Sequence, residues 1–167
     1  MSKLLSILLF LFIAGAVAAL VYTVARPVGN KPFTEFSILG LDNSADDYPS
    51  QFNMTGNQAI SVTYDRGSTT EGWGYVTVGI VNHENRTAIY SLQVKVDNVP
   101  VDVNYQGEIL PQLAQLSIPS GQSWQGQIGF VPEHDGANQE VGFLLFNGNS
   151  KNPEDTLHLW INVTATP

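Results

Sequence analysis

Cysteine is absent from the 167 residues, and basic side chains are few. Without cysteine the chain can form no disulfide, no thiolate metal site, no cysteine nucleophile and no lipid-modified cysteine. Fifteen acidic residues stand against seven basic ones, so the net charge is −8. Only four lysines and arginines follow residue 31, and the chain therefore lacks the basic surface that nucleic acids bind. These absences exclude nucleic acid as a partner and leave packing alone to hold the fold.

Charge of either sign is missing from one long stretch, Leu4–Ala25. A helix of this length rises roughly 33 Å, which is enough to cross a hydrocarbon core of about 30 Å. Arg26 and Pro27 would end that helix, because proline cannot continue it. We therefore predict a transmembrane anchor over residues 1–26 and a linker over residues 27–32. A cleaved signal peptide is the alternative, since Lys3, an apolar run and small residues follow one another in the required order.

Small residues within the predicted anchor offer a packing face. Gly15 and Ala19 lie four residues apart, which is the small-xxx-small spacing of helices that associate in membranes. A type IV pilin is disfavoured, because no acidic residue precedes Glu35. With either an anchor or a signal peptide, the chain from Pro27 onward is expected to lie outside the cytoplasm. All 15 acidic residues fall in this part of the chain, which carries a net charge of −11 from residue 35.

Beyond the linker, apolar and polar residues alternate with a period of two, which is typical of strands. Clusters of Asn, Asp, Gly, Pro and Ser separate the runs and predict turns. We therefore expect a mainly β fold, an immunoglobulin-like β-sandwich of seven to nine strands over residues 33–167. The polar segment Gly40–Asn57 is expected to be a loop. The expected strands are Phe33–Leu39, Ile60–Tyr64, Tyr75–Val81, Tyr90–Val96, Val99–Tyr105, Trp124–Phe130, Val141–Phe146 and Leu157–Val163.

Four local strings, in this order, resemble a known family: Phe33–Phe36, Tyr48-Pro49, Val78–Glu84 and Leu157–Trp160. Together they are similar to the domain-of-unknown-function 1616 family, which occurs mainly in archaea and joins membrane helices to an extracytoplasmic β-domain. The resemblance covers about residues 33–163. Many members carry several membrane helices before this domain, whereas one apolar segment is found here. The resemblance implies a fold and a location and no activity.

Three N-glycosylation sequons begin at Asn53, Asn85 and Asn162. Each can accept a glycan if it lies outside the membrane and is accessible. Asn85 falls in a predicted turn and is the best placed of the three. Asn162 falls in a predicted strand near the C-terminus and is the least well placed.

Residues that could hold a metal ion occur, but their spacing does not favour a site. Oxygen ligands gather in the loop Asp42–Asp47, yet the glycine and glutamate of a calcium-binding EF-hand loop are missing. His83, His134 and His158 lack the spacing of zinc ligands. We expect a solvated acidic loop, histidines bonded within their own turns and strands, and neither a metal nor a cofactor.

Catalytic patterns are also missing. No Gly-x-Ser-x-Gly elbow and no phosphate-binding glycine loop occurs, so we predict no catalytic residues and no enzyme activity. Trp73 follows a polar run and is the best candidate for an aromatic side chain at an interface, where it would contact a glycan or a protein. The sequence therefore predicts a membrane-anchored structural or interaction module of the cell envelope. It would bind other envelope proteins or itself; the alternative is an accessory single-pass subunit of a membrane complex.

Overall fold

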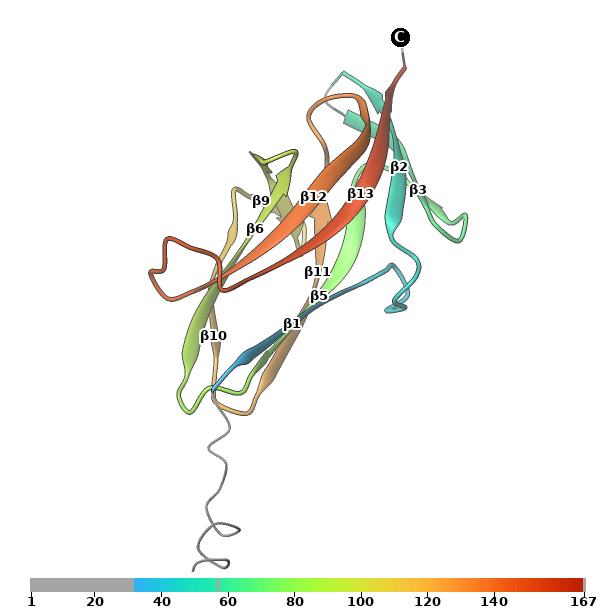
Figure 1. Ribbon diagram of the computed structural model, residues 1–167. Helices are drawn as coiled ribbons and strands as arrows, with labels where there is room; N and C mark the ends of the chain where they lie inside the picture. The colour runs from blue at the N-terminus through green and yellow to red at the C-terminus, as the bar shows by residue number, and fades with distance from the viewer. Residues whose placement is uncertain (1–31, 57, 167) are drawn as a thin grey trace, which may run out of the picture. The chain divides into compact units, whose positions relative to one another are not determined.

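The computed structural model describes residues 32–56 and 58–166, and these residues form two β-sheets (Figure 1). Within this part of the chain there is no helix, and hence none long and apolar enough to cross a bilayer. The predicted anchor, with Gly15 and Ala19, lies outside the described residues. The fold is mainly β and sandwich-like, as the alternating pattern predicts.

The first sheet, sheet A, has five antiparallel strands in the order β1-β5-β11-β8-β9. Its strands are β1 (Thr34–Leu39), β5 (Gly74–Asn82), β11 (Ser123–Phe130), β8 (Val103–Tyr105) and β9 (Glu108–Leu110). The register defines the two ends of sheet A: Thr34 pairs with Asn82 at one end, and Gly74 pairs with Phe130 at the other. Nine residues of β5 therefore separate an Asn82 end from a Gly74 end, over roughly 27 Å.

The second sheet, sheet B, has the order β10-β6-β12-β13-β2-β3-β4, with β7 paired to β6. All of its pairs are antiparallel except β13 with β2, which is parallel. The strands are β10 (Leu113–Ile118), β6 (Ala88–Val96), β12 (Gly136–Asn147), β13 (Asp155–Ala165), β2 (Pro49–Thr55), β3 (Gln58–Tyr64), β4 (Thr69–Thr70) and β7 (Val99–Val101).

The core lies between the sheets and is filled by the apolar residues of each alternation. In β6 every second residue from Ala88 to Val96 is buried. Phe130 from sheet A is the central contact: its ring lies 5.6 Å from that of Phe52 and 5.8 Å from that of Phe143, both in sheet B. Aromatic pairs at these distances add to the hydrophobic contribution of burial, so one ring joins three strands of the two sheets.

The eight predicted strands are present, and the structure differs from the prediction at three places. The described residues form thirteen strands rather than seven to nine, because short strands such as β4 and β9 give little periodic signal. The run Val99–Tyr105 is divided at Asp102, where the chain leaves sheet B (β7) and enters sheet A (β8). The segment Gly40–Asn57 is a loop only at its beginning, and β2 forms its second half.

Candidate functional site

A groove of about 720 Å³ opens at the Gly74 end of the domain. Its walls come from four places: the start of β3, the three residues that precede β5, strand β9, and the residue that follows β11. The lining residues are Gln58, Ala59, Ile60, Glu71, Gly72, Trp73, Ile109 and Val131. We call this site the Trp73 groove. It contains the tryptophan that the sequence singles out as a candidate interface residue.

Local structure holds Trp73 in place from both sides. Gly72 has a φ of 79°, a left-handed backbone that favours glycine, and it turns the chain into β5. A Cβ on Gly74 would lie 2.4 Å from Cζ of Phe52, so the chain packs closely against the core at that point. The Thr70 hydroxyl donates to the Trp73 carbonyl at 3.3 Å. The backbone that carries the tryptophan is thus fixed by a turn, a close contact and a hydrogen bond.

Two isoleucines supply the exposed aliphatic side chains of the groove. Ile60 is 50% exposed and Ile109 is 60% exposed, and both line the groove together with Trp73. Glu71 is the one charged side chain among the lining residues. Large apolar side chains gathered around one concavity are typical of a surface that binds apolar groups of a partner.

Ile60 is exposed because of a β-bulge that the sequence pattern does not reveal. The alternation places Ile60 on the same face as Val62, but Val62 is buried and Ile60 is not. Asn53 pairs with Ser61 while Met54 pairs with Ala59, so Ile60 is the extra residue of a bulge. A bulge turns its extra residue out of the regular alternation. The register shift thus supplies one wall of the groove.

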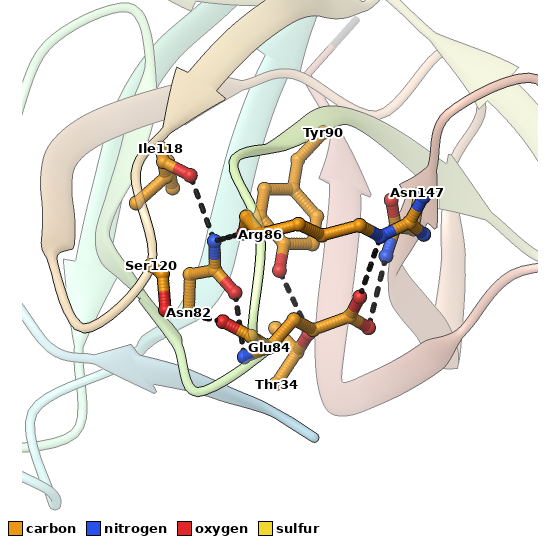
Figure 2. Close-up of polar contacts among 8 residues, drawn as sticks. All are labelled: Thr34, Asn82, Glu84, Arg86, Tyr90, Ile118, Ser120 and Asn147. Carbon is orange, nitrogen blue, oxygen red and sulfur yellow. Dashed lines mark hydrogen bonds and ion pairs between the residues drawn. The ribbon is translucent and has the colours of Figure 1, made fainter. Parts of the chain in front are cut away.

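At the Asn82 end, a buried polar network joins three turns (Figure 2). The Asn82 side chain is fully buried. Its Nδ2 donates to the carbonyls of Arg86 at 2.9 Å and Ile118 at 2.7 Å, and its Oδ1 accepts from the Glu84 N–H at 2.8 Å. Every polar atom of this amide is used within the protein, so Asn82 has a structural role.

Glu84 extends the same network toward the surface. Its carboxylate accepts from Arg86 Nε at 3.3 Å and from Asn147 Nδ2 at 3.3 Å (Figure 2). Its carbonyl accepts from the Ser120 hydroxyl at 2.5 Å. Nearby, the hydroxyls of Thr34 and Tyr90 lie 2.8 Å apart and join sheet A to sheet B. The network ties the turns after β5, β10 and β12 together.

In the acidic loop Asp42–Asp47, the exposed carboxylates of Asp42 and Asp46 pair with Arg66. The Arg66 guanidinium lies 2.6 Å from the Asp46 carboxylate and 3.4 Å from that of Asp42. The hydrogen bond from Arg66 lowers the pKa of Asp46, and the hydrogen bond from Ser44 lowers the pKa of Asp42. These carboxylates already have a cationic partner.

The buried member of that loop also has its own donor. Asp47 is buried, and its Oδ1 accepts the backbone N–H of Arg66 at 2.9 Å. Because Arg66 is shared by three of the loop's carboxylates, the loop is a structural junction between β1 and β2.

The three histidines lie at separate places. His83 Nε2 pairs with Glu35 at 3.0 Å, and its ring stacks on Phe33 with centroids 4.5 Å apart. His158 Nδ1 pairs with Glu140 at 2.7 Å. No group of three or more potential metal ligands comes together in residues 32–56 and 58–166.

The three sequons differ in how their asparagines are held. Asn53 lies in β2, and its Nδ2 donates to the Ser61 hydroxyl at 2.8 Å. Asn162 lies in β13, where its Oδ1 accepts from the Asn138 N–H at 2.9 Å. Asn85 lies in an exposed turn after β5. Glycosylation stays a prediction, and Asn85 is the site whose amide can be modified without breaking a strand contact.

Comparison with known proteins gives a family and a distant structural neighbour. Residues 50–162, more than half of the chain, match the family described as Domain of unknown function (DUF1616), which confirms the resemblance seen in the sequence. One solved structure with a match is the CARDB domain of a Pyrococcus furiosus protein, crystallised in complex with di-metal ions. It has 10% sequence identity and a TM-score of 0.45, and the match covers 84% of this chain and 95% of that chain. None of the curated proteins matches the chain.

Proposed function

The chain belongs to the DUF1616 family, and we propose that it is a non-enzymatic, membrane-anchored interaction module of the cell envelope. In this proposal the apolar segment Leu4–Ala25 anchors the chain, and an immunoglobulin-like sandwich outside the cytoplasm binds another envelope protein. The Trp73 groove is the binding site. The observation that carries the proposal is the gathering of Trp73, Ile60 and Ile109 around one groove at the Gly74 end.

The position of the groove supports this role. Phe33 immediately precedes β1, and β1 begins opposite Asn82, so the segment that leads from the proposed anchor joins the domain at the Asn82 end. The groove lies at the other end of sheet A, beside Gly74. The point of attachment and the groove therefore lie at opposite ends of β5, and a partner can reach the groove without contacting the attached end.

The chemistry of the lining favours a protein over a glycan. A sugar is bound by an aromatic ring together with several polar side chains that pair with its hydroxyls. Here the tryptophan is accompanied by two exposed isoleucines and by only two side chains, Gln58 and Glu71, with polar groups. Tryptophan surrounded by aliphatic side chains is typical of the energetically dominant part of a protein interface. The expected ligand is therefore an apolar side chain of a partner protein.

Site-specific photo-crosslinking in the native cells tests the proposal. A photoreactive amino acid at Ile60 or Ile109 is expected to form an adduct with one defined envelope protein. Ile89 is the matched control, because it is an isoleucine of similar exposure (54%) in β6 and does not line the groove. Trp73→Ala, combined with the label at Ile109, is expected to reduce the adduct by about tenfold, which is typical of an aromatic residue at the centre of an interface.

The outcomes separate the two candidate functions. Equal adducts from Ile89 and from the groove positions would exclude the Trp73 groove as a specific site. Adducts that form only from labels at Gly15 and Ala19 would instead support an accessory subunit held by its proposed membrane helix. If the Trp73→Ala chain forms the adduct in an unaltered amount, Trp73 does not contribute to the interface.

A further inference from the structure

One side of β13 is only partly covered. β13 pairs with β12 from Asp155 to Val163, but it pairs with β2 only from Asn162 to Ala165. Figure 1 shows that β13 extends beyond the start of β2, and β1, which belongs to the other sheet, approaches β13 without pairing with it. Along Asp155–Ile161, therefore, no strand in the described part of the chain pairs with the side of β13 that faces away from β12. We call this segment the β13 edge.

A hollow of about 370 Å³ lies beside this edge. It is lined by Leu157, His158, Leu159 and Trp160 of β13 and by Ile38, Tyr48, Pro49 and Asp65 across from them. Trp160 is 57% exposed although it is a large apolar side chain. A strand edge with a hollow beside it supplies the two elements of strand addition, which are backbone hydrogen bonds and pockets for alternate side chains.

The β13 edge lacks several of the features that usually protect a strand from pairing with another chain. Such features are short strands, lysines, prolines and bulges. β4 and β9 have two and three residues, β7 contains Pro100, and a register shift interrupts β10. The β13 edge has seven residues with no lysine, arginine or proline. At the start of the edge, the Thr156 N–H donates to the Asp155 side chain at 2.7 Å.

Charge determines the kind of strand that fits. From residue 35 the chain has 15 acidic and four basic residues, and two of the basic ones, Arg66 and Arg86, are already paired with carboxylates. Asp65 lines the hollow and Asp155 begins the edge. A second copy of this acidic domain would be repelled, whereas a basic segment would be attracted.

We propose that the β13 edge is a docking site for an extended segment of another protein in which apolar and basic residues alternate. The segment adds to sheet B beside β13, its apolar side chains fill the hollow next to Trp160, and its basic side chains face Asp65 and Asp155. This site shares no lining residue with the Trp73 groove, so it is a second interaction surface that goes beyond the proposed function.

Hydrogen exchange of the full 167-residue chain, followed by mass spectrometry, tests this site. The probe is a capped peptide of about eight residues, in which valine and lysine alternate, at up to about 1 mM. Saturating peptide is expected to slow amide exchange in Asp155–Ile161 by about tenfold or more, because new backbone hydrogen bonds protect the edge. A peptide in which glutamate replaces lysine is expected to bind at least ten times more weakly.

Two sets of variants make the result specific. Asp65→Lys with Asp155→Lys is expected to weaken binding of the valine–lysine peptide by about tenfold. Glu108→Lys with Glu133→Lys changes the net charge equally at exposed positions away from the hollow, and is expected to change binding less than twofold. Trp73→Ala is expected to leave peptide binding unchanged, which distinguishes this site from the Trp73 groove.

Several results would overturn the proposal. These are no binding at 1 mM, equal binding of the glutamate peptide, or protection that falls at the Trp73 groove instead of the β13 edge. Protection of the β13 edge that rises with the concentration of the chain alone would show that a second copy is the occupant. If both pairs of charge substitutions weaken peptide binding equally, the binding depends on the net charge of the domain and not on the β13 edge.

Discussion

Replacement of Asn82 by alanine is expected to destabilise the domain by about 3 kcal/mol. The amide makes three hydrogen bonds, two from Nδ2 to the carbonyls of Arg86 and Ile118 and one to Oδ1 from the Glu84 N–H. Alanine leaves all three backbone partners without the side chain that binds them. Each buried group that loses its partner costs about 1 to 3 kcal/mol. We use the lower value because the Glu84 and Arg86 groups are only partly buried.

Urea unfolding of the full chain, followed by tryptophan fluorescence, measures this loss, because all three tryptophans lie in the sandwich. The expected signature is a lower midpoint with an unchanged slope, since the surface exposed on unfolding stays the same. Asn85→Ala is the matched control: it changes an exposed asparagine of the same turn and is expected to cost less than about 0.5 kcal/mol. A loss below about 1 kcal/mol for Asn82→Ala, or equal losses for the two variants, would refute the reasoning.

The variant Asn82→Asp adds a test of the direction of these hydrogen bonds. Aspartate keeps the shape but has no N–H, so its carboxylate would face the carbonyl oxygens of Arg86 and Ile118. The charged form is therefore disfavoured in the folded state, and the pKa of this carboxyl is raised above its unfolded value of about 3.9. A folded state that binds the extra proton is most stable below the unfolded pKa, and this stability is lost as the pH rises through the folded pKa.

Relative to the natural chain, Asn82→Asp should therefore lose more stability at pH 7 than at pH 4. The expected difference is about 1 kcal/mol or more, because a shift of one pKa unit is worth about 1.4 kcal/mol in full and about 0.4 kcal/mol of it is already lost at pH 4, next to the unfolded pKa. The same urea titrations at the two pH values measure it. A penalty that does not depend on pH would mean that Nδ2 is not the donor in these contacts.

Two further predictions concern close packing and the acidic loop. Gly74→Ala places a Cβ 2.4 Å from the Phe52 ring and should destabilise the domain by about 1 to 3 kcal/mol in the urea assay. Gly142→Ala is the control and should cost less, because its Cβ would have its nearest neighbour at 3.4 Å. Equal costs for the two variants would contradict the packing argument. Arg66→Gln removes the donor that lowers the pKa of Asp46, so the pKa of this carboxyl should rise in an NMR titration, and an unchanged value would contradict the ion pair.

Local periodicity was sufficient to predict the long strands. In β6 the alternation from Ala88 to Val96 matches the buried positions, because one face of this strand packs on the core. Asp97 and Asn98, which separate two of the predicted strands, both have positive φ, which is the geometry of a two-residue hairpin. Asn and Asp tolerate that backbone, so both the strand and its end could be read from adjacent residues.

The exchange of strands between sheets could not be predicted in the same way. Val101 and Val103 are both buried, and the alternation passes through Asp102 without a break. A period of two identifies the buried face, but it is the same in either sheet. The division into β7 and β8 depends on pairing with β6 and β11, which are distant in sequence.

The candidate site was predicted only in part, for a related reason. Trp73 is predicted as an interface residue because it follows a polar run. Ile60 and Ile109 are not, because the bulge that exposes the first is set by pairing with β2 and the second lies in a three-residue strand. The motif Val78–Glu84 was noticed as a family resemblance, and the structure explains it physically: Val78 and Ile80 are buried in the core, and Asn82 holds the turn that follows.

The loop between β1 and β2 also determines how much of β13 stays unpaired. The chain leaves sheet A after Leu39 and reaches sheet B only at Pro49, through a loop that is tightly constrained. A Cβ on Gly40 would lie 2.1 Å from the Asp47 carbonyl, and Asp47 in turn is buried and accepts the Arg66 N–H. Because this loop fixes where β2 starts, β2 meets β13 only from Asn162 onward. The β13 edge, which pairs with no second strand among residues 32–56 and 58–166, is therefore a consequence of a fixed crossing between the sheets, and we expect it to be present whether or not a partner strand is bound.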